Sequence, residues 1–108
     1  MADIITSALQ TLQLFNLLAD DYRPRMLAEV EALVALHKHT WSRSSIHRML
    51  NTLAAANMLR QSTTGEWSIH PHVTAIAVNY QQSIIRRSEA IIAEVAEIHK
   101  TTSERIAE

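Results

Sequence analysis

A single glycine, Gly65, occurs in the 108 residues of the chain. Glycine permits positive backbone angles and close approach of a ligand, and both the P-loop and the dinucleotide-binding fingerprint use several glycines at fixed spacing. The sequence therefore excludes nucleotide-binding enzymes of those types. Because the chain also has only two prolines and 5% aromatic residues, its composition favours a mostly helical fold.

The length fits one small domain that buries a core of its own. The chain has no cysteine, which excludes a disulfide scaffold and thiolate chemistry, including cysteine-ligated zinc. No stretch approaches the roughly 20 uninterrupted apolar residues of a membrane span, and no basic region precedes the first apolar residues. We therefore expect a cytoplasmic protein.

Three helices are predicted in the first half of the chain. The first begins at Ser7, whose hydroxyl can cap free backbone amides while the side chain of Gln10 reaches back. The second spans residues 26–37 and the third spans 42–56, with Ser42 and Ser44 as candidate N-caps. Their apolar residues at helical spacing are Leu9, Leu12, Phe15 and Leu18, then Leu27, Val30, Leu33, Val34 and Leu36, then Ile46, Met49, Leu50 and Leu53.

The pattern then changes from helical spacing to alternation. Residues 58–62 and 67–70 each alternate, and the segment between them contains Gly65, which can adopt a positive φ at little cost. A β-hairpin is therefore predicted. Residues 73–107 contain neither glycine nor proline and return to helical spacing. A helix of ~30 residues is about 45 Å long, which is longer than a domain of ~70 residues can cover. The far end of this helix therefore needs a partner.

The C-terminal helix offers an apolar stripe to a second copy of itself. Ser88 and Thr102 stand where a two-helix seam prefers apolar residues, so a broad helix-on-helix dimer is favoured over a strict zipper. A break near Ser83 or near residues 101–103 is the alternative. The predicted dimer interface is Ile84, Ile91, Val95 and Ile98.

The outward face of the third helix predicts a nucleic-acid interface. Arginine and asparagine can form bidentate hydrogen bonds with guanine and adenine edges, and serine and threonine reach phosphates or bases. On a helical wheel Ser44, Arg48 and Asn51 fall within about 60° of one another, with His47 and Thr52 beside them. A capped and solvated helix is the alternative interpretation.

The charge is distributed unevenly along the chain, although the formal net charge is only −1. The first third and the last third are acidic on balance. The middle, residues 37–72, carries Lys38, Arg43, Arg48 and Arg60 against Glu66 alone. A basic middle of this kind favours contact with a phosphate backbone.

Residues 40–53, 57–60 and 65–71 resemble the winged helix-turn-helix domain of the IclR family of bacterial transcription regulators, over about residues 8–72. The family's recognition helix has the core pattern Ser-Thr-Val-x-Arg-x-Leu-x-x-Leu, followed by a Leu-Arg strand and an aromatic wing strand. Here the matching residues are Ser44, Ser45, Ile46, Arg48, Leu50 and Leu53, then Leu59 and Arg60, then Trp67, Ser68 and Ile69. Thr40 and Ser42 depart from the turn glycine and the proline of the family pattern.

The resemblance implies a mainly α fold: a winged helix-turn-helix of three helices and a β-hairpin wing over residues 1–72, then a long helical dimerisation segment over 73–108. It further implies a homodimeric regulator that binds double-stranded DNA, a repressor or activator of bacterial transcription. The compactness of the chain, and not the resemblance, favours a phage or mobile-element origin as an alternative to a bacterial one. We expect no counterpart of the family's large C-terminal effector-binding domain in the residues after the wing. The predicted DNA-binding residues are Arg43, Ser44, Ser45, His47, Arg48, Asn51, Thr52, Arg60 and Thr64.

Several alternatives stay open. A protein-interaction module, an inhibitor or adaptor with the same fold and no DNA role, fits the weak overall charge. Two His-x-His pairs, at 37–39 and 70–72, could ligate a metal. Nothing in the sequence shows that the two pairs meet, so no metal or cofactor is predicted. His99 lies on a solvated helix face, so we expect no enzyme. Trp41 and Trp67 are predicted core residues rather than base-stacking ones.

Overall fold

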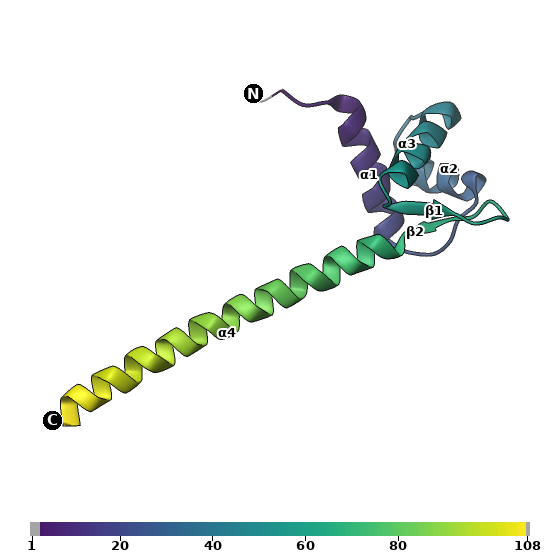
Figure 1. Cartoon of the computed structure of the whole chain (residues 1–108). Helices are drawn as coiled ribbons and strands as arrows, with labels where there is room; N and C mark the ends of the chain where they lie inside the picture. Colours follow the sequence, from purple (N-terminus) through teal and green to yellow (C-terminus); the bar gives the residue numbers. More distant parts are fainter. Residues whose placement is uncertain (1–2, 108) are drawn as a thin grey trace. The chain divides into compact units, whose positions relative to one another are not determined.

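The computed structural model describes residues 3–107, and their side chains as far as residue 104. Its elements are α1 (Thr6–Asp20), α2 (Leu27–Leu36), α3 (Arg43–Ala55), β1 (Leu59–Gln61), β2 (Trp67–Ile69) and α4 (Pro71–Ala107) (Figure 1). This order of three helices, a hairpin and a long helix confirms the predicted fold class. The chain divides between Val73 and Thr74 into two compact units.

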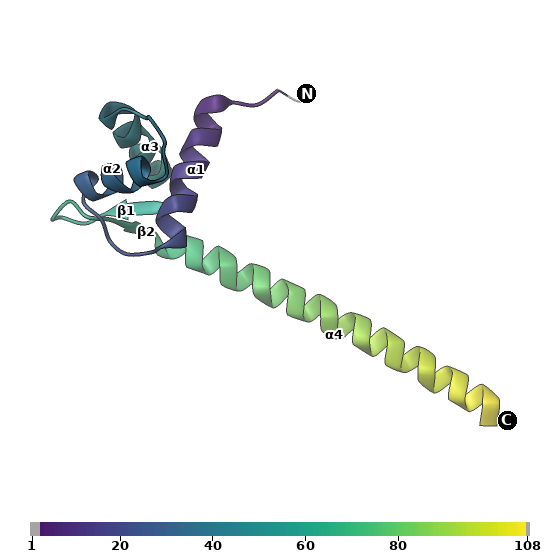
Figure 2. The ribbon, with the colours of Figure 1, turned by 180° about the vertical axis from the view of Figure 1, so that it is seen from behind.

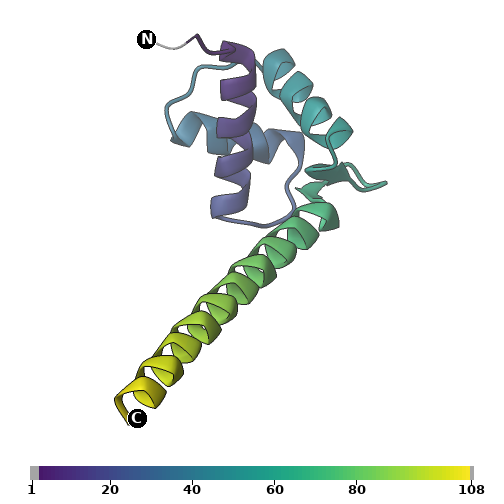
Figure 3. The same ribbon diagram turned by 60° about the vertical axis from the view of Figure 1, so that its left-hand side comes forward.

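The first unit is built on three mutually packed helices. Contacts join α1 to α3, α1 to α2 and α2 to α3, and Figure 3 shows α2 crossing behind α1 while α3 lies beside it. The hairpin closes the same unit through contacts between α3 and β1 (Figure 2). The buried core consists of Leu14, Leu18, Val30, Val34, Ile46, Met49, Leu50, Leu53, Leu59 and Trp67.

The start of α1 differs from the predicted cap. The helix begins at Thr6, with Ile5 as an N-cap that makes no side-chain hydrogen bond, so Ser7 lies inside the first turn. The carbonyl of Ser7 accepts a hydrogen bond from the hydroxyl of Thr11 at 2.7 Å. The predicted capping box of Ser7 and Gln10 is therefore wrong, because the helix starts two residues earlier than that box requires.

The buried side of α1 also differs from the predicted stripe. Leu14 and Leu18 are buried, whereas Leu9 and Leu12 are 42% and 52% exposed. The helix is rich in leucine on more than one side, so helical spacing alone fits two overlapping stripes. Packing against α2 and α3 selects the stripe that includes Leu14.

Helix α3 forms as its sequence predicts. The hydroxyl of Ser42 accepts the backbone N–H of Ser45 at 3.1 Å and so caps the helix. Its apolar stripe, with Leu50 and Leu53 at its centre, is buried as predicted. This burial fixes which side of α3 remains outward.

Two left-handed residues end the helices on either side of the turn. The backbone reverses at Lys38 (φ 63°), after α2, and at Asn57 (φ 58°), after α3. The N–H groups of Lys38 and His39 donate to Ala35 and Val34, the pattern of a Schellman motif. The reversal thus takes place at Lys38, two residues before Thr40, where the family pattern has its turn glycine.

The wing is a short antiparallel hairpin that Gly65 closes. Strand β1 pairs with β2 so that Leu59 faces Ile69 and Gln61 faces Trp67. Gly65 has φ +96°, as its place in the predicted turn requires. The backbone of Ser62 exchanges hydrogen bonds with Glu66 and Gly65 at 2.9 and 3.0 Å. These bonds hold the loop at the tip of the hairpin.

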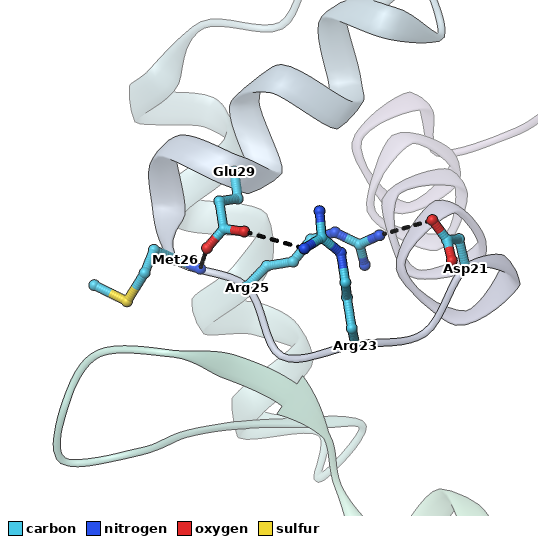
Figure 4. A network of polar contacts seen from close by, with 5 residues as sticks. All are labelled: Asp21, Arg23, Arg25, Met26 and Glu29. Carbon is cyan, nitrogen blue, oxygen red and sulfur yellow. Dashed lines mark hydrogen bonds and ion pairs between the residues drawn. The ribbon is translucent and has the colours of Figure 1, made fainter.

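An unpredicted third segment joins the hairpin. Arg25, between α1 and α2, forms an isolated antiparallel bridge with Trp67 through two backbone hydrogen bonds of 2.7 and 2.9 Å. Around it, Arg25 pairs with Asp21, and Glu29 binds both Arg23 and the backbone N–H of Met26 (Figure 4). The connection between the first two helices is therefore tied to the sheet.

The two tryptophans differ in depth. Trp67 is buried in the core, as predicted. Trp41 is partly buried and packs against the edge of the core. Its ring stacks on the imidazole of His39 with centroids 4.1 Å apart.

Helix α4 is continuous from Pro71 to Ala107, without the predicted alternative break near Ser83 or residues 101–103. His70 precedes this helix, and the Nδ1 atom of its ring accepts a hydrogen bond from the N–H of His72, in the first turn, at 3.0 Å. Pro71 then occupies the first turn, where its missing N–H costs nothing. Within residues 3–107, no helix is both long enough and apolar enough to cross a membrane.

Candidate nucleic-acid interface

The outer face of α3 consists of polar side chains that all lie in solvent. It comprises Ser44, His47, Arg48, Asn51 and Thr52. Ser44, Arg48 and Asn51 lie on the side of the helix opposite Ile46 and Leu50, which are buried, and His47 and Thr52 flank them. The structure thus brings together on one surface the residues that the helical wheel selects.

Arg48 is the charged residue at the centre of this outer face. Among the described residues its guanidinium forms no ion pair. The hydroxyl of Thr52 donates to the carbonyl of Arg48 at 2.8 Å, which leaves the oxygen of Thr52 free to accept. Arginine offers five donors in a planar fork, which matches the two acceptors on the major-groove edge of guanine.

Ser45 belongs to the cap rather than to the outer face. It is half-buried, its N–H is bound by Ser42, and its hydroxyl oxygen accepts the hydroxyl of Ser42 at 3.0 Å. A hydroxyl held in this way has one remaining hydrogen to donate. The sequence pattern grouped Ser45 with Ser44, and the structure separates them.

Arg43 is held by an acidic residue of α2. Its Nε atom lies 3.2 Å from Oε1 of Glu31, although the geometry is not that of a hydrogen bond. Glu31 is partly buried while the Arg43 side chain is 68% exposed. The Arg43 side chain therefore stays largely in solvent, although its Nε atom lies beside Glu31. The sequence carried no sign of this pair, because Glu31 and Arg43 are 12 positions apart and on different helices.

The wing supplies the remaining predicted residues from a separate element. Arg60 is exposed on β1, and Thr64 is exposed in the loop before β2. The hydroxyl of Thr64 lies 2.9 Å from that of Ser62 and donates weakly to Glu66 at 3.5 Å. The loop therefore places the hydroxyls of Ser62 and Thr64 beside Glu66, while Arg60 lies on the strand that precedes it.

A groove of about 660 Å³ separates α1 from α3. Its floor includes Met49 and Leu53, and sequence reasoning did not identify it because it forms only where two distant segments meet. Polar groups from both helices line it: Ser7, Gln10 and Thr11 of α1, and Ser45, Arg48 and Thr52 of α3. Ser7, Gln10 and Thr11 thus extend the polar surface beside the outer face of α3.

The outer face of α3, the start of that helix and the wing together present exposed hydrogen-bonding and cationic side chains. The outer face of α3 presents hydrogen-bonding side chains on a rigid helix, which has the width to enter a major groove. Arg43 precedes the residues of the outer face in the sequence and Arg60 follows them. Both carry positive charge that suits phosphates.

Comparison with known proteins identifies the fold. No protein-family model matches the sequence, and no curated protein matches it. Among solved structures, the Agobacterium tumefaciens repressor BlcR matches with a TM-score of 0.55 and 22% sequence identity, over 73% of this chain. The chain corresponds to 30% of the BlcR chain. The similarity shows that the fold is a winged helix.

Proposed function

We propose that this chain is a sequence-specific regulator of transcription, similar to the IclR family, that binds double-stranded DNA as a homodimer. Residues 1–72 form the DNA-binding domain and residues 73–108 the dimerisation segment. Two independent likenesses support the proposal: the sequence motif over residues 40–71, and the winged-helix fold shared with a protein described as a repressor. Repression would follow if the bound dimer blocks access of polymerase to the promoter.

The outer face of α3 is the observation that carries the proposal. Polar side chains cover the exposed face of any surface helix, but this face combines an arginine, an asparagine and hydroxyl residues, which can hydrogen-bond to base edges and phosphates. Helix-turn-helix proteins present the N-terminal part of such a helix to base edges. Arg48 and Asn51 have the donor patterns that match guanine and adenine.

The roles of the remaining residues follow from their surroundings. Arg43 and Arg60 neutralise phosphates and provide affinity that depends on salt but not on sequence. Ser44 and Thr64 have exposed hydroxyls that suit phosphate oxygens. Ser45 acts through Ser42, because it fixes the start of the helix.

The second copy is recruited through α4. Ile84, Ile91, Val95 and Ile98 are between 45% and 64% exposed in the single chain. Burial of such side chains stabilises an association by roughly 25 cal/mol for each Å² removed from water. Dimerisation also doubles the DNA contact, so each half-site needs only modest affinity.

Selection of bound duplexes from a random DNA library tests this function. The full chain is used at about 0.1 M salt, at which non-specific attraction is partly screened. We expect enrichment of a motif with two related half-sites. Recovery of no motif, with only weak and salt-sensitive binding, would contradict the proposal and favour a protein-interaction module.

A further inference from the structure

Helix α4 carries an exposed apolar stripe. Tyr80, Ile84, Ile91, Val95 and Ile98 fall within about 60° on a helix that turns about 100° per residue. Their side chains are 45–68% exposed. A stripe of this kind on a helix of 37 residues is typical of a surface that another helix covers.

The two edges of this stripe differ in chemistry. Ile85 and Ile92 lie along one edge, where they are 48% and 67% exposed. Arg87 and Glu94 lie along the other edge and are exposed. They are seven residues apart, or about 10.5 Å along the axis, too far to pair with each other within one helix. Among the described residues neither forms an ion pair.

The unlike edges distinguish the two possible directions of a symmetric pair. In a parallel pair each edge meets the opposite edge of the other helix, so Arg87 and Glu94 would lie against Ile85 and Ile92. Charged groups covered by apolar side chains lose hydration without compensation. In an antiparallel pair each edge meets the same edge of the other helix. The isoleucines then meet isoleucines, and the charged edge meets a charged edge.

The charged edge also sets the register. When Ile91 lies on the two-fold axis, Ile84 faces Ile98 of the second copy. Arg87 then lies one residue, about 1.5 Å along the axis, from the level of Glu94 of the second copy. The symmetry repeats this arrangement, so two ion pairs form at once. Arg87 and Glu94 can form ion pairs with each other only between two copies of the chain. This favours a second copy of this chain as the partner of the stripe.

We propose that two α4 helices pair antiparallel, centred on Ile91, with Arg87 of each copy bound to Glu94 of the other. This inference rests on the homodimer of the proposed function and specifies its geometry. The Val73 residues of the two copies are then about 54 Å apart along the helix axes, since 18 residues separate each from the centre. The two winged-helix units are thus attached at opposite ends of the pair.

Single-cysteine cross-linking of the full chain tests the direction, because the natural sequence has no cysteine. The Ile84→Cys and Ile98→Cys variants are oxidised separately and as a mixture, without DNA. In the antiparallel pair, two copies of residue 84 are about 21 Å apart, beyond the about 4.4–6.8 Å between Cα atoms that a disulfide spans. We expect disulfide-linked dimers from the mixture and few from either variant alone.

Two results would overturn the proposal. Efficient cross-linking of Ile84→Cys alone would show a parallel pair. No cross-linking of the mixture, together with none of Ile91→Cys, would show that this stripe does not join two copies. The Ile91→Cys variant is the positive control, because residue 91 meets itself in the proposed register.

Charge reversal tests the ion pairs separately. Arg87→Glu places two acids together and is expected to raise the dimer Kd about fivefold, the order of effect for two exposed pairs. Addition of Glu94→Arg to the same chain should restore the Kd, and failure of this rescue would contradict the register. Arg86→Glu, on the opposite side of the helix, is the matched control. None of these measurements involves DNA, so their failure is distinct from failure of the DNA-binding proposal.

Discussion

The Nη2 atom of Arg25 lies 3.4 Å from Oδ2 of Asp21, although the Arg25 side chain is 2% exposed and that of Asp21 is 82% exposed (Figure 4). The second terminal nitrogen, Nη1, has no hydrogen-bond partner among the described residues. The bridge between Arg25 and Trp67 fixes the main chain from which this buried side chain extends. Asp21 is thus the carboxylate that compensates a charge within the first unit.

Removal of that carboxylate should destabilise the fold. Asp21→Asn is expected to lower the free energy of unfolding by about 1 kcal/mol, because the guanidinium stays buried and loses its counter-charge. Asp20→Asn, one residue earlier and also exposed, is the control and should change stability by less than about 0.5 kcal/mol. Urea denaturation at one fixed protein concentration measures both, since a dimer's stability depends on concentration. Equal effects of the two variants would contradict this role of Asp21.

The core of α3 should be far more sensitive than the exposed end of α2. Leu50 is fully buried and Leu36 is 75% exposed. We expect Leu50→Ala to cost about 2–5 kcal/mol through lost burial and the cavity that remains. Leu36→Ala should stay within about 0.5 kcal/mol, because that side chain is already in water. A large loss from Leu36→Ala in denaturant titrations would show that this residue is covered by a partner.

The left-handed turn residue offers a stabilising substitution. Lysine at Lys38 holds φ 63°, where its Cβ is crowded. Lys38→Gly should raise the thermal midpoint by stabilising the fold about 0.5–1 kcal/mol, since glycine adopts this conformation without that cost. Lys38→Ala removes the charge but not the Cβ, and should leave the midpoint nearly unchanged. A similar gain from alanine would attribute the effect to charge instead of backbone conformation.

The ion pair between Glu31 and Arg43 should lower the affinity of the protein for DNA of any sequence. Glu31→Gln removes a negative charge near the start of α3 and frees Arg43 for a phosphate. We expect a gain of about two- to fivefold in affinity for duplexes of any sequence, with a steeper salt dependence. Glu97→Gln on α4 has the same change in charge and should have little effect. Fluorescence anisotropy with a random-sequence duplex distinguishes them, and equal gains would contradict a specific role for this pair.

The sequence allows prediction of those elements whose signals are local. The stripe of α3, its serine cap and the glycine of the wing each depend on neighbouring residues, and the structure agrees with all three. The stripe of α1 was predicted in part: Leu18 is buried and Phe15 packs against the core as expected, whereas Leu9 and Leu12 are exposed and Leu14 is buried instead. Several leucines satisfy helical spacing, and only packing against α2 and α3 decides between them. Burial of Arg25 was not predicted, since a charged residue after a proline gives no sign of a bridge to a strand 42 positions away.

The candidate interface was predicted in part. The wheel placed Ser44, Arg48 and Asn51 outward, and each is exposed in the structure. The hold of Glu31 on Arg43, and the groove between α1 and α3, depend on contacts between separate helices. Contact of these residues with DNA stays a prediction.

The affinity of Arg48→Ala for the duplex enriched from the random library tests the central claim most directly. Arg48 is exposed and lies outside the core, so the variant should fold as the parent does. We expect it to lose about 1–3 kcal/mol of discrimination between the enriched duplex and a scrambled one, the effect typical of one bidentate base contact. Arg86→Ala, which removes the same charge from α4, should keep that discrimination. Unchanged discrimination in Arg48→Ala would contradict the assignment of α3 as the helix that reads DNA.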